Sequence, residues 1–158
     1  MNKEDIMQLG ITEAFKTMSQ NIGGPFGAVI VRGNEIISVS SNHVIANNDP
    51  TAHAEIMAIR EACKKLRTYD LSGCEIYATG YPCPMCMAAI IWANIKKVYV
   101  SGTPLDAEEV GFRDKYIYDF IRECEFVDNH EVLEIVPLDR HPARMLYKEY
   151  VKMNKTIY

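Results

Sequence analysis

The chain has 158 residues, a formal net charge of -4 and a sequence pI near 5.6. Net negative charge opposes the attraction to phosphates that supplies most non-specific nucleic-acid affinity, so we expect a small-molecule substrate and no nucleic-acid partner. With 48% hydrophobic and 24% charged residues the composition excludes a largely disordered chain. The length suits a single domain over residues 1–158.

The N-terminal stretch and the cysteines bear on the cellular compartment. MNKEDIMQLGITEAFKTM lacks the uninterrupted apolar core of a signal peptide, and no later run is long enough to span a bilayer. We therefore expect a cytoplasmic protein without a membrane partner. The five cysteines are an odd number in a chain without an export signal, which favours metal binding or burial over a disulfide framework.

The first half of the chain predicts a helix, a hairpin and a second helix. Apolar residues recur at helical intervals over 5–20, until NIGGPFG interrupts them. Residues 27–42 hold two β-branched runs around RGNE, which is typical of an antiparallel hairpin. The segment 47–66 has Asp, Pro and Thr at 49–51 and lysines at 64 and 65 near its end, so it predicts a helix with His53 and Glu55 in its first turn.

The second half predicts a strand–helix–strand unit and then less regular structure. CEIYATG and KKVYVSG are strands on either side of PMCMAAIIWANI, a helix with proline at its first position. Two strands joined through a helix imply parallel neighbours and a right-handed crossover. Beyond residue 103 we expect short helical turns joined at Gly111, a last strand over 130–138 and a closing helix over 141–153. This order indicates an α/β fold, a three-layer α/β/α sandwich around a mixed five-stranded sheet.

Two predicted helix starts carry the side chains that suit a metal. His53 and Glu55 lie on one, Cys83 and Cys86 on the other. Successive helices on one sheet face bring their N-termini together at the carboxyl ends of the strands, where open sheets place ligands. Cysteines three apart at a helix start point the same way, and the positive end of the helix dipole favours their thiolates.

One imidazole and two thiolates make three protein ligands for Zn²⁺, which leaves the fourth tetrahedral position to water, as in catalytic zinc sites. The predicted ligands are His53, Cys83 and Cys86. Zinc lowers the pKa of its water toward 7 and so provides a hydroxide nucleophile, but a proton must still be moved to the substrate. Glu55 is the predicted proton shuttle, because it lies two residues from a ligand and the ligand set is complete without it. The structural alternative is that the cysteines are simply buried.

The order H-x-E followed by P-C-x-x-C is the known signature of zinc-dependent nucleobase deaminases. It reads HAE at 53–55 and PCPMC at 82–86. Together with three further motifs, the chain resembles the cytidine deaminase superfamily, and within it the small zinc-dependent guanine deaminases of bacteria. The motifs that carry this resemblance are GGPFGAVIV, NDPTAHAE, PCPMC and, for guanine deaminase in particular, GFRDKYIY.

The resemblance implies a cytidine deaminase-like fold and a hydrolase of purine catabolism. It implies attack of the zinc-bound hydroxide at C2 of guanine, protonation of the ring and the amino group through Glu55, and release of xanthine and ammonia. Related enzymes form dimers or higher oligomers, so the resemblance also implies a homodimer in which the C-terminal tail of one subunit completes the site of the other.

The resemblance further assigns residues to the base. Phe26 resembles the ring that stacks on the purine, Asn42 the amide that hydrogen-bonds it, and Ala54 a backbone contact beside the metal. Asp114 in GFRD resembles the carboxylate that reads the N–H-rich edge of guanine, since an ionised carboxylate only accepts hydrogen bonds. Without the resemblance, Phe26 could anchor a glycine loop, Asn42 could cap a turn and Asp114 could cap a helical turn.

The resemblance also bears on two further aromatic residues, and at one position the chain differs from the related enzymes. Trp92 and the terminal Tyr158 match positions that resemble pocket walls or a lid, although core or dimer packing competes for Trp92. Related guanine and tRNA deaminases commonly carry Glu where this chain has Tyr81, a change in pocket lining that bears on the substrate. LDRHPARM matches poorly, so any second catalytic acid there is unassigned.

Three other functions remain open at this point. A cytosine deaminase or a tRNA adenosine deaminase would share the metal centre, and only the pocket residues or a basic surface would distinguish them. A structural zinc module of a non-enzymatic protein would need a fourth protein ligand and would leave Glu55 without a role.

Overall fold

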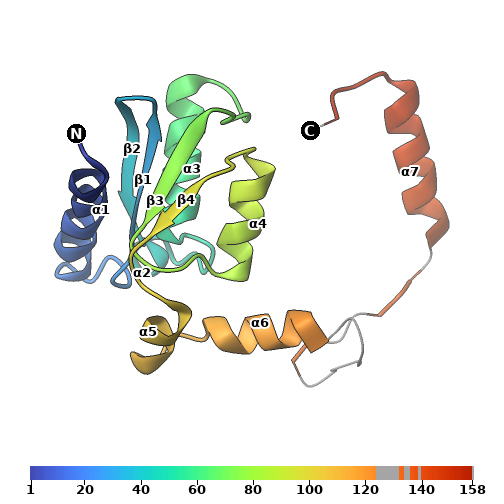
Figure 1. The fold of residues 1–158 in the computed structure, drawn as a ribbon. Helices are drawn as coiled ribbons and strands as arrows, with labels where there is room; N and C mark the ends of the chain where they lie inside the picture. Colours follow the sequence, from blue (N-terminus) through green and yellow to red (C-terminus); the bar gives the residue numbers. More distant parts are fainter. Residues whose placement is uncertain (124–131, 134–135, 139, 158) are drawn as a thin grey trace. The chain divides into compact units, whose positions relative to one another are not determined.

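The structure is a computed structural model that describes residues 1–123, 132–133, 136–138 and 140–157. The chain forms two compact units, residues 1–118 and 119–158. In chain order (Figure 1) the elements are α1 (Lys3–Met18), β1 (Gly27–Arg32), β2 (Glu35–Ser41), α2 (Val44–Asn47), α3 (Ala54–Leu66), β3 (Cys74–Ala78), α4 (Pro84–Trp92), β4 (Val98–Val100), α5 (Pro104–Glu109), α6 (Asp114–Glu123) and α7 (Arg140–Lys152).

The first unit is built on a mixed sheet with the strand order β2-β1-β3-β4. Strand β1 runs antiparallel to β2 and to β3, and β3 runs parallel to β4. The predicted hairpin and the predicted parallel pair are thus confirmed. The described sheet has four strands rather than the five expected. The expected fifth strand, 130–138, includes residues 130, 131, 134 and 135, which lie outside the described residues.

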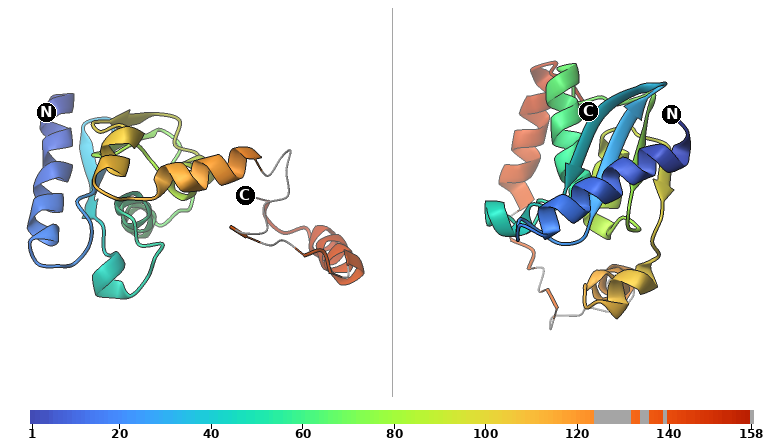
Figure 2. Two further views of the ribbon diagram at one scale, coloured as in Figure 1. Left: turned by 90° about the horizontal axis from the view of Figure 1, so that it is seen from below. Right: turned by 90° about the vertical axis from the view of Figure 1, so that its left-hand side faces the viewer.

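Helices cover both faces of this sheet, as Figures 1 and 2 show for α1 on one side and α3 on the other. On the first face Ile6 of α1 packs in a cluster with Val29 and Val31 of β1. On the other face Ile30 of β1 packs with Ala58 of α3. The alternation follows from the two-residue period of a strand, and each fully buried aliphatic side chain contributes roughly 1.5–3 kcal/mol. The α/β/α layering predicted from the sequence is confirmed.

A close contact between backbones seats α1 over the start of β1. A Cβ on Gly27 would lie 2.0 Å from the carbonyl oxygen of Gly10, so only glycine fits there. The N–H of Gly27 donates to Thr79 Oγ1 at 2.9 Å, which joins the start of β1 to the end of β3. The start of β1 is therefore held to α1 by a close backbone contact and to the end of β3 by this hydrogen bond.

The second unit contains the C-terminal helix α7, in agreement with the closing helix predicted over 141–153. None of the α7 residues is buried. Near its end the Tyr150 hydroxyl donates to the carbonyl of Thr156 at 2.7 Å. Among the described residues, no helix has both the length and the apolar character needed to cross a bilayer.

Candidate active site

Helices α3 and α4 begin in the same way, each with a residue that can bind a metal at its N-cap. His53 has an extended backbone (φ -66°, ψ 158°), and so does Cys83 (φ -66°, ψ 168°). Pro84 takes the first position of α4, where the missing N–H has no helical partner to lose. Cys86 then follows on the first turn of α4, with its side chain near that of Cys83.

The start of α3 differs slightly from the prediction, which placed His53 inside the first turn. Asp49 and Thr51 form a separate turn, in which Asp49 Oδ1 accepts hydrogen bonds from the Thr51 N–H at 2.8 Å and from its hydroxyl at 2.6 Å. Because this turn uses the residues expected to start the helix, α3 begins at Ala54 and His53 is its N-cap.

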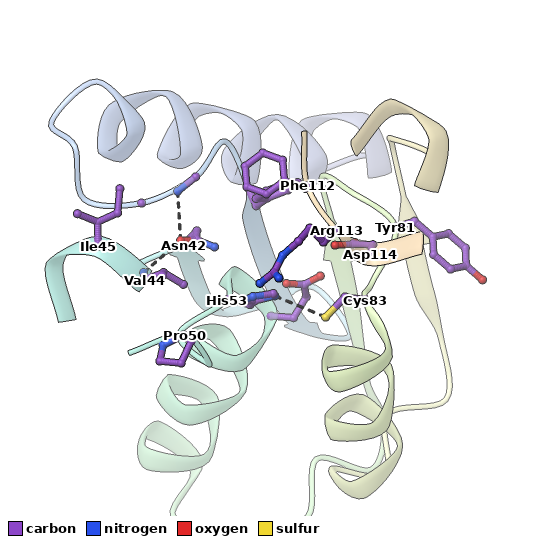
Figure 3. Close-up of a pocket in the computed structure, with 14 residues that line it drawn as sticks. Asn42, Val44, Ile45, Pro50, His53, Tyr81, Cys83, Phe112, Arg113 and Asp114 are labelled. Carbon is purple, nitrogen blue, oxygen red and sulfur yellow. Dashed lines mark hydrogen bonds between the residues drawn. The ribbon is translucent and has the colours of Figure 1, made fainter. Parts of the chain in front are cut away.

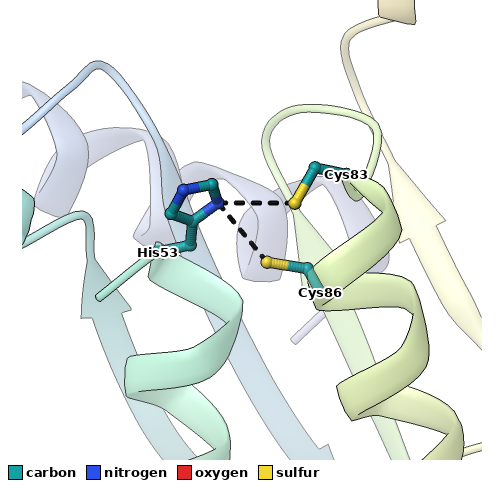
Figure 4. Close-up of side chains that lie close together, drawn as sticks. All are labelled: His53, Cys83 and Cys86. Carbon is teal, nitrogen blue, oxygen red and sulfur yellow. Dashed lines mark hydrogen bonds between the residues drawn. The ribbon is translucent and has the colours of Figure 1, made fainter. Parts of the chain in front are cut away.

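The imidazole of His53, at the start of α3, faces the two sulfurs at the start of α4 (Figure 4). Its Nδ1 is 3.5 Å from Cys83 Sγ and 3.6 Å from Cys86 Sγ. Tetrahedral zinc with its usual bonds to sulfur and nitrogen separates those two ligand atoms by about 3.6 Å. The three side chains therefore fit Zn²⁺. Within the described part of the chain, no fourth His, Cys or carboxylate belongs to this group.

Glu55 lies beside the group and is buried, with 8% of its surface exposed. The Cys86 thiol donates to Glu55 Oε2 at 3.5 Å. Burial raises the pKa of the Glu55 carboxyl above its ordinary value. A raised pKa brings proton uptake and release closer to neutral pH, as proton transfer in catalysis requires.

The sulfurs and the imidazole shift one another's protonation. The hydrogen bond from Cys86 lowers the pKa of the Cys83 thiol to about 4, and the same hydrogen bond raises the pKa of Cys86. The hydrogen bond with Cys83 raises the pKa of His53. The group thus holds a thiolate at neutral pH, which is the form of cysteine that binds metals.

A cavity of about 390 Å³ opens at this group (Figure 3). Its lining comes from the glycine loop before β1, the end of β2 with α2, the start of α3, the loop before α4 and the α5–α6 connection. All of these segments belong to the first unit. Small-molecule sites have volumes of roughly 300–1,000 Å³, so the cavity suits a small ligand.

Two aromatic rings form one wall of the cavity. Phe26 and Phe112 pack edge to face, with ring centroids 4.8 Å apart and an interplanar angle of 77°. Both residues line the cavity. An aromatic wall of this kind suits a planar, apolar ring face.

The Asn42 side chain is held by the backbone around it. Its Oδ1 accepts from the N–H groups of Gly24 and Val44, each at 3.1 Å, so its Nδ2 faces the cavity (Figure 3). Gly23 permits this arrangement, because a Cβ there would lie 2.1 Å from the Asn42 carbonyl oxygen. The amide therefore presents a hydrogen-bond donor to the cavity.

Asp114 is the first residue of α6 and presents a carboxylate to the cavity. Burial raises the pKa of this carboxyl, and the nearby Cys83 raises it further. Four residues later, the Tyr118 hydroxyl donates to the carbonyl of Pro82 at 2.6 Å. This bond ties α6 to the loop that leads into the metal-ligating cysteines.

The structure thus brings Phe26, Asn42 and Asp114 to one cavity with Glu55 and two of the predicted ligands, His53 and Cys83. The third, Cys86, is fully buried and does not line the cavity. Ala54 is fully buried and does not itself line the cavity, although it lies between two residues that do. Trp92 ends α4 with 67% of its surface exposed and does not line the cavity.

Tyr158 lies outside the described residues, so its predicted role stays a prediction. Tyr81 lines the cavity, as expected for a change in pocket lining, but its ring points away from the metal-ligating group (Figure 3). The sequence reasoning missed Phe112 and Arg113 as lining residues. The GFRD motif that singled out Asp114 contains both, so the motif was the available signal.

Comparison with known proteins bears on what this cavity does. Residues 1–102 match the family described as the cytidine and deoxycytidylate deaminase zinc-binding region. The chain belongs to this family. Guanine deaminase of Bacillus subtilis is 48% identical over 118 residues, which are 75% of this chain and 76% of the relative. A tRNA-specific adenosine deaminase of Aquifex aeolicus is 39% identical over 153 residues, 96% of this chain and 95% of the relative.

The solved structures agree with the family and with the fold. The crystal structure of the Bacillus subtilis guanine deaminase matches with a TM-score of 0.86 and 40% identity, covering 100% of this chain and 99% of that one. The cytidine deaminase-like α/β fold expected from the sequence is confirmed. Membership of a zinc-binding deaminase family agrees with the donor set of His53, Cys83 and Cys86, which fits Zn²⁺.

Proposed function

We propose that this deaminase hydrolyses guanine to xanthine and ammonia. The observation that carries the proposal is a single cavity that joins the His53–Cys83–Cys86 group, the buried Glu55 and the carboxylate of Asp114. The similarity to a guanine deaminase over three quarters of the chain supports this substrate.

His53, Cys83 and Cys86 would hold the metal. Bound there, Zn²⁺ would make a water molecule nucleophilic at neutral pH. Glu55 takes one proton from the water and delivers it to the ring nitrogen, and it then carries the proton of the hydroxyl at C2 to the amino group. Water adds at C2, the bond between C2 and the amino nitrogen breaks, and ammonia leaves, so the overall reaction consumes one water.

The remaining lining residues position the base. Phe26 packs on a face of the purine, and Asn42 Nδ2 donates to one of its acceptors. Asp114 accepts hydrogen bonds from the N–H groups of guanine, since an ionised carboxylate offers acceptors only. The backbone at Ala54 borders the base beside the metal. Holding the ring in this way places C2 next to Glu55.

A substrate panel tests the proposal. Ammonia release is measured for the zinc-loaded protein with guanine, adenine, cytosine and cytidine. We expect turnover of guanine, with kcat/KM at least about tenfold above that for the other bases. Clear turnover of cytosine without turnover of guanine would contradict the substrate and leave the chemistry of the site in place.

A tRNA adenosine deaminase is the second candidate, because the Aquifex aeolicus relative matches 96% of the chain. The net charge of -4 opposes this function, since binding of a tRNA depends on phosphate contacts. Incubation with an anticodon stem-loop RNA decides between them. Conversion of adenosine to inosine in that RNA would favour the second candidate.

We also propose a homodimer with exchange of the C-terminal tail, in which Tyr158 completes the partner's cavity and Trp92 packs at the interface. Two exposed apolar surfaces support a dimer. Ile91 and Trp92 on α4 are each 67% exposed, and on α7 Leu146 and Val151 are 69% and 70% exposed. Light scattering should give twice the monomer mass of 17.9 kDa.

The cytoplasmic location and a single domain over 1–158 stay predictions.

A further inference from the structure

The α5–α6 connection places a cation at the cavity. Arg113 lines the cavity next to Asp114. Figure 3 shows the Arg113 side chain extending into the space between the α6 start and His53. The lining thus contains the positive charge of Arg113 together with two carboxyl groups, those of Glu55 and Asp114.

The backbone of Arg113 is held on both sides. Before it, the Phe112 N–H donates to the carbonyl of Ala107 at 3.0 Å, and the Phe112 ring packs against Phe26. After it, the Ile117 N–H donates to the carbonyl of Arg113 at 3.3 Å. The position of this residue at the cavity is therefore set by the surrounding structure rather than by a free loop.

The guanidinium is available to a ligand. Among the described residues, Arg113 makes no ion pair with Asp114, Glu55 or any other carboxylate, and its guanidinium forms no hydrogen bond. An arginine side chain carries five N–H donors in a planar fork and no acceptor. A ligand that uses this fork must present two acceptors side by side.

We propose that Arg113 reads the acceptor edge of the bound base, donating to the 6-oxo group and N7 of guanine. This inference rests on the proposed function. The spacing of O6 and N7 matches the arginine fork, a pairing that proteins use widely to recognise guanine. Both atoms lie on the side of the ring system away from C2, so this contact leaves C2 and its amino group facing Glu55.

In this arrangement the hydrogen-bond donors and the acceptors of the cavity contact different atoms of the base. Arg113 and Asn42 Nδ2 supply donors, and Asp114 supplies acceptors. Adenine fits this set poorly, because it presents an amino donor where guanine has O6. Arg113 is thus a specificity residue for purines with a 6-oxo group.

The test compares guanine with 2-aminopurine, which keeps the amino group at C2 and N7 but lacks the 6-oxo group. For wild type, Arg113→Met and Arg113→Lys, we measure kcat/KM for guanine and the inhibition constant of 2-aminopurine against guanine. Arg32→Met, at the exposed end of β1, is the matched control. Zinc content and melting temperature establish that each variant is folded.

For Arg113→Met we expect kcat/KM for guanine to fall about 10- to 100-fold, and the constant for 2-aminopurine to change about threefold or less. Arg113→Lys should recover only part of the loss, because an ammonium cannot form the paired contact. If Arg113→Met does not fold, a loss of about fivefold or more for guanine in Arg113→Lys, without a matching change for 2-aminopurine, supports the assignment.

Three outcomes overturn the inference: full activity of Arg113→Met, an equal loss for both purines, or full activity of Arg113→Lys, which would assign the effect to charge alone. A wild-type protein that deaminates another base but not guanine would instead refute the proposed function, and the inference with it. The wild-type measurement therefore separates the two failures.

Discussion

The two units of the chain differ in how far their apolar side chains are buried. In the first unit, Val29 and Ile30 on β1 point to opposite faces of the sheet, and both are fully buried. In the second, Leu146 and Val151 on α7 are 69% and 70% exposed. Buried side chains of this size contribute roughly 1.5–3 kcal/mol each, and exposed ones contribute little. The cavity therefore rests on a unit with its own core, whereas α7 offers the kind of surface that marks association.

The largest expected effect belongs to the site that this core supports. Glu55→Gln keeps the shape of the side chain but removes its capacity to transfer a proton. We expect kcat for guanine to fall by roughly 10²- to 10⁴-fold. Zinc content and melting temperature should stay at wild-type values. Glu61→Gln, the same substitution on the same helix but outside the cavity lining, should keep its activity, and retained activity in Glu55→Gln would remove that residue from its role.

A pair of truncations measures the contrast between the units directly. Ile76→Ala on β3 removes a fully buried side chain and should lower the free energy of unfolding by about 2–5 kcal/mol. Leu146→Ala on α7 should change it by about 0.5 kcal/mol or less in dilute protein. Urea unfolding at low concentration gives both values. Equal losses would mean that α7 is packed as firmly as the sheet.

A substitution at Asp114 tests whether the cavity selects its base. Asp114→Ala removes the carboxylate that accepts from guanine N–H groups, so kcat/KM for guanine should fall about 10- to 100-fold. The rates for the other bases of the panel should change less. Glu109→Ala, which removes an exposed carboxylate at the end of α5, is the control. An unchanged substrate profile would leave Asp114 as a residue of the helix start only.

The smallest expected effect lies at the last residue of the first unit. Tyr118→Phe removes the 2.6 Å hydrogen bond to the Pro82 carbonyl and should cost about 0.5–1.5 kcal/mol of stability. Tyr116→Phe, at a side chain that is 52% exposed, is the matched control. Thermal unfolding gives the difference. Equal melting temperatures for the two variants would show that α6 is not anchored through this bond.

Local patterns predicted much of the scaffold. The hairpin of β1 and β2 was evident from two β-branched runs around a turn, and the parallel pair of β3 and β4 from the helix between them. The same topology predicted that His53, Cys83 and Cys86 would meet, because both helix starts lie at one edge of the sheet. These features depend on residues that are close in sequence or on general rules of connection.

The features that sequence reasoning missed depend on contacts between distant segments. Helix α2 has four residues and no side-chain cap, so no periodic pattern marks it. No sequence pattern distinguishes Arg113 from a surface arginine, and its place at the cavity depends on the packing of Phe112 against Phe26. Trp92 belongs to the apolar run PMCMAAIIW, in which the sequence does not show which helix face is buried. Tertiary packing decides each of these cases.

The position of His53 and Cys83 one residue before their helices has a thermodynamic consequence. With these residues as ligands, fraying of α3 or α4 would pull a ligand away from the metal, so metal affinity and helix stability are linked. Each tenfold increase in free zinc above its dissociation constant should then add about 1.4 kcal/mol to the stability of the first unit. The bound metal would thus cross-link the starts of two helices that lie on one face of the sheet and stabilise both.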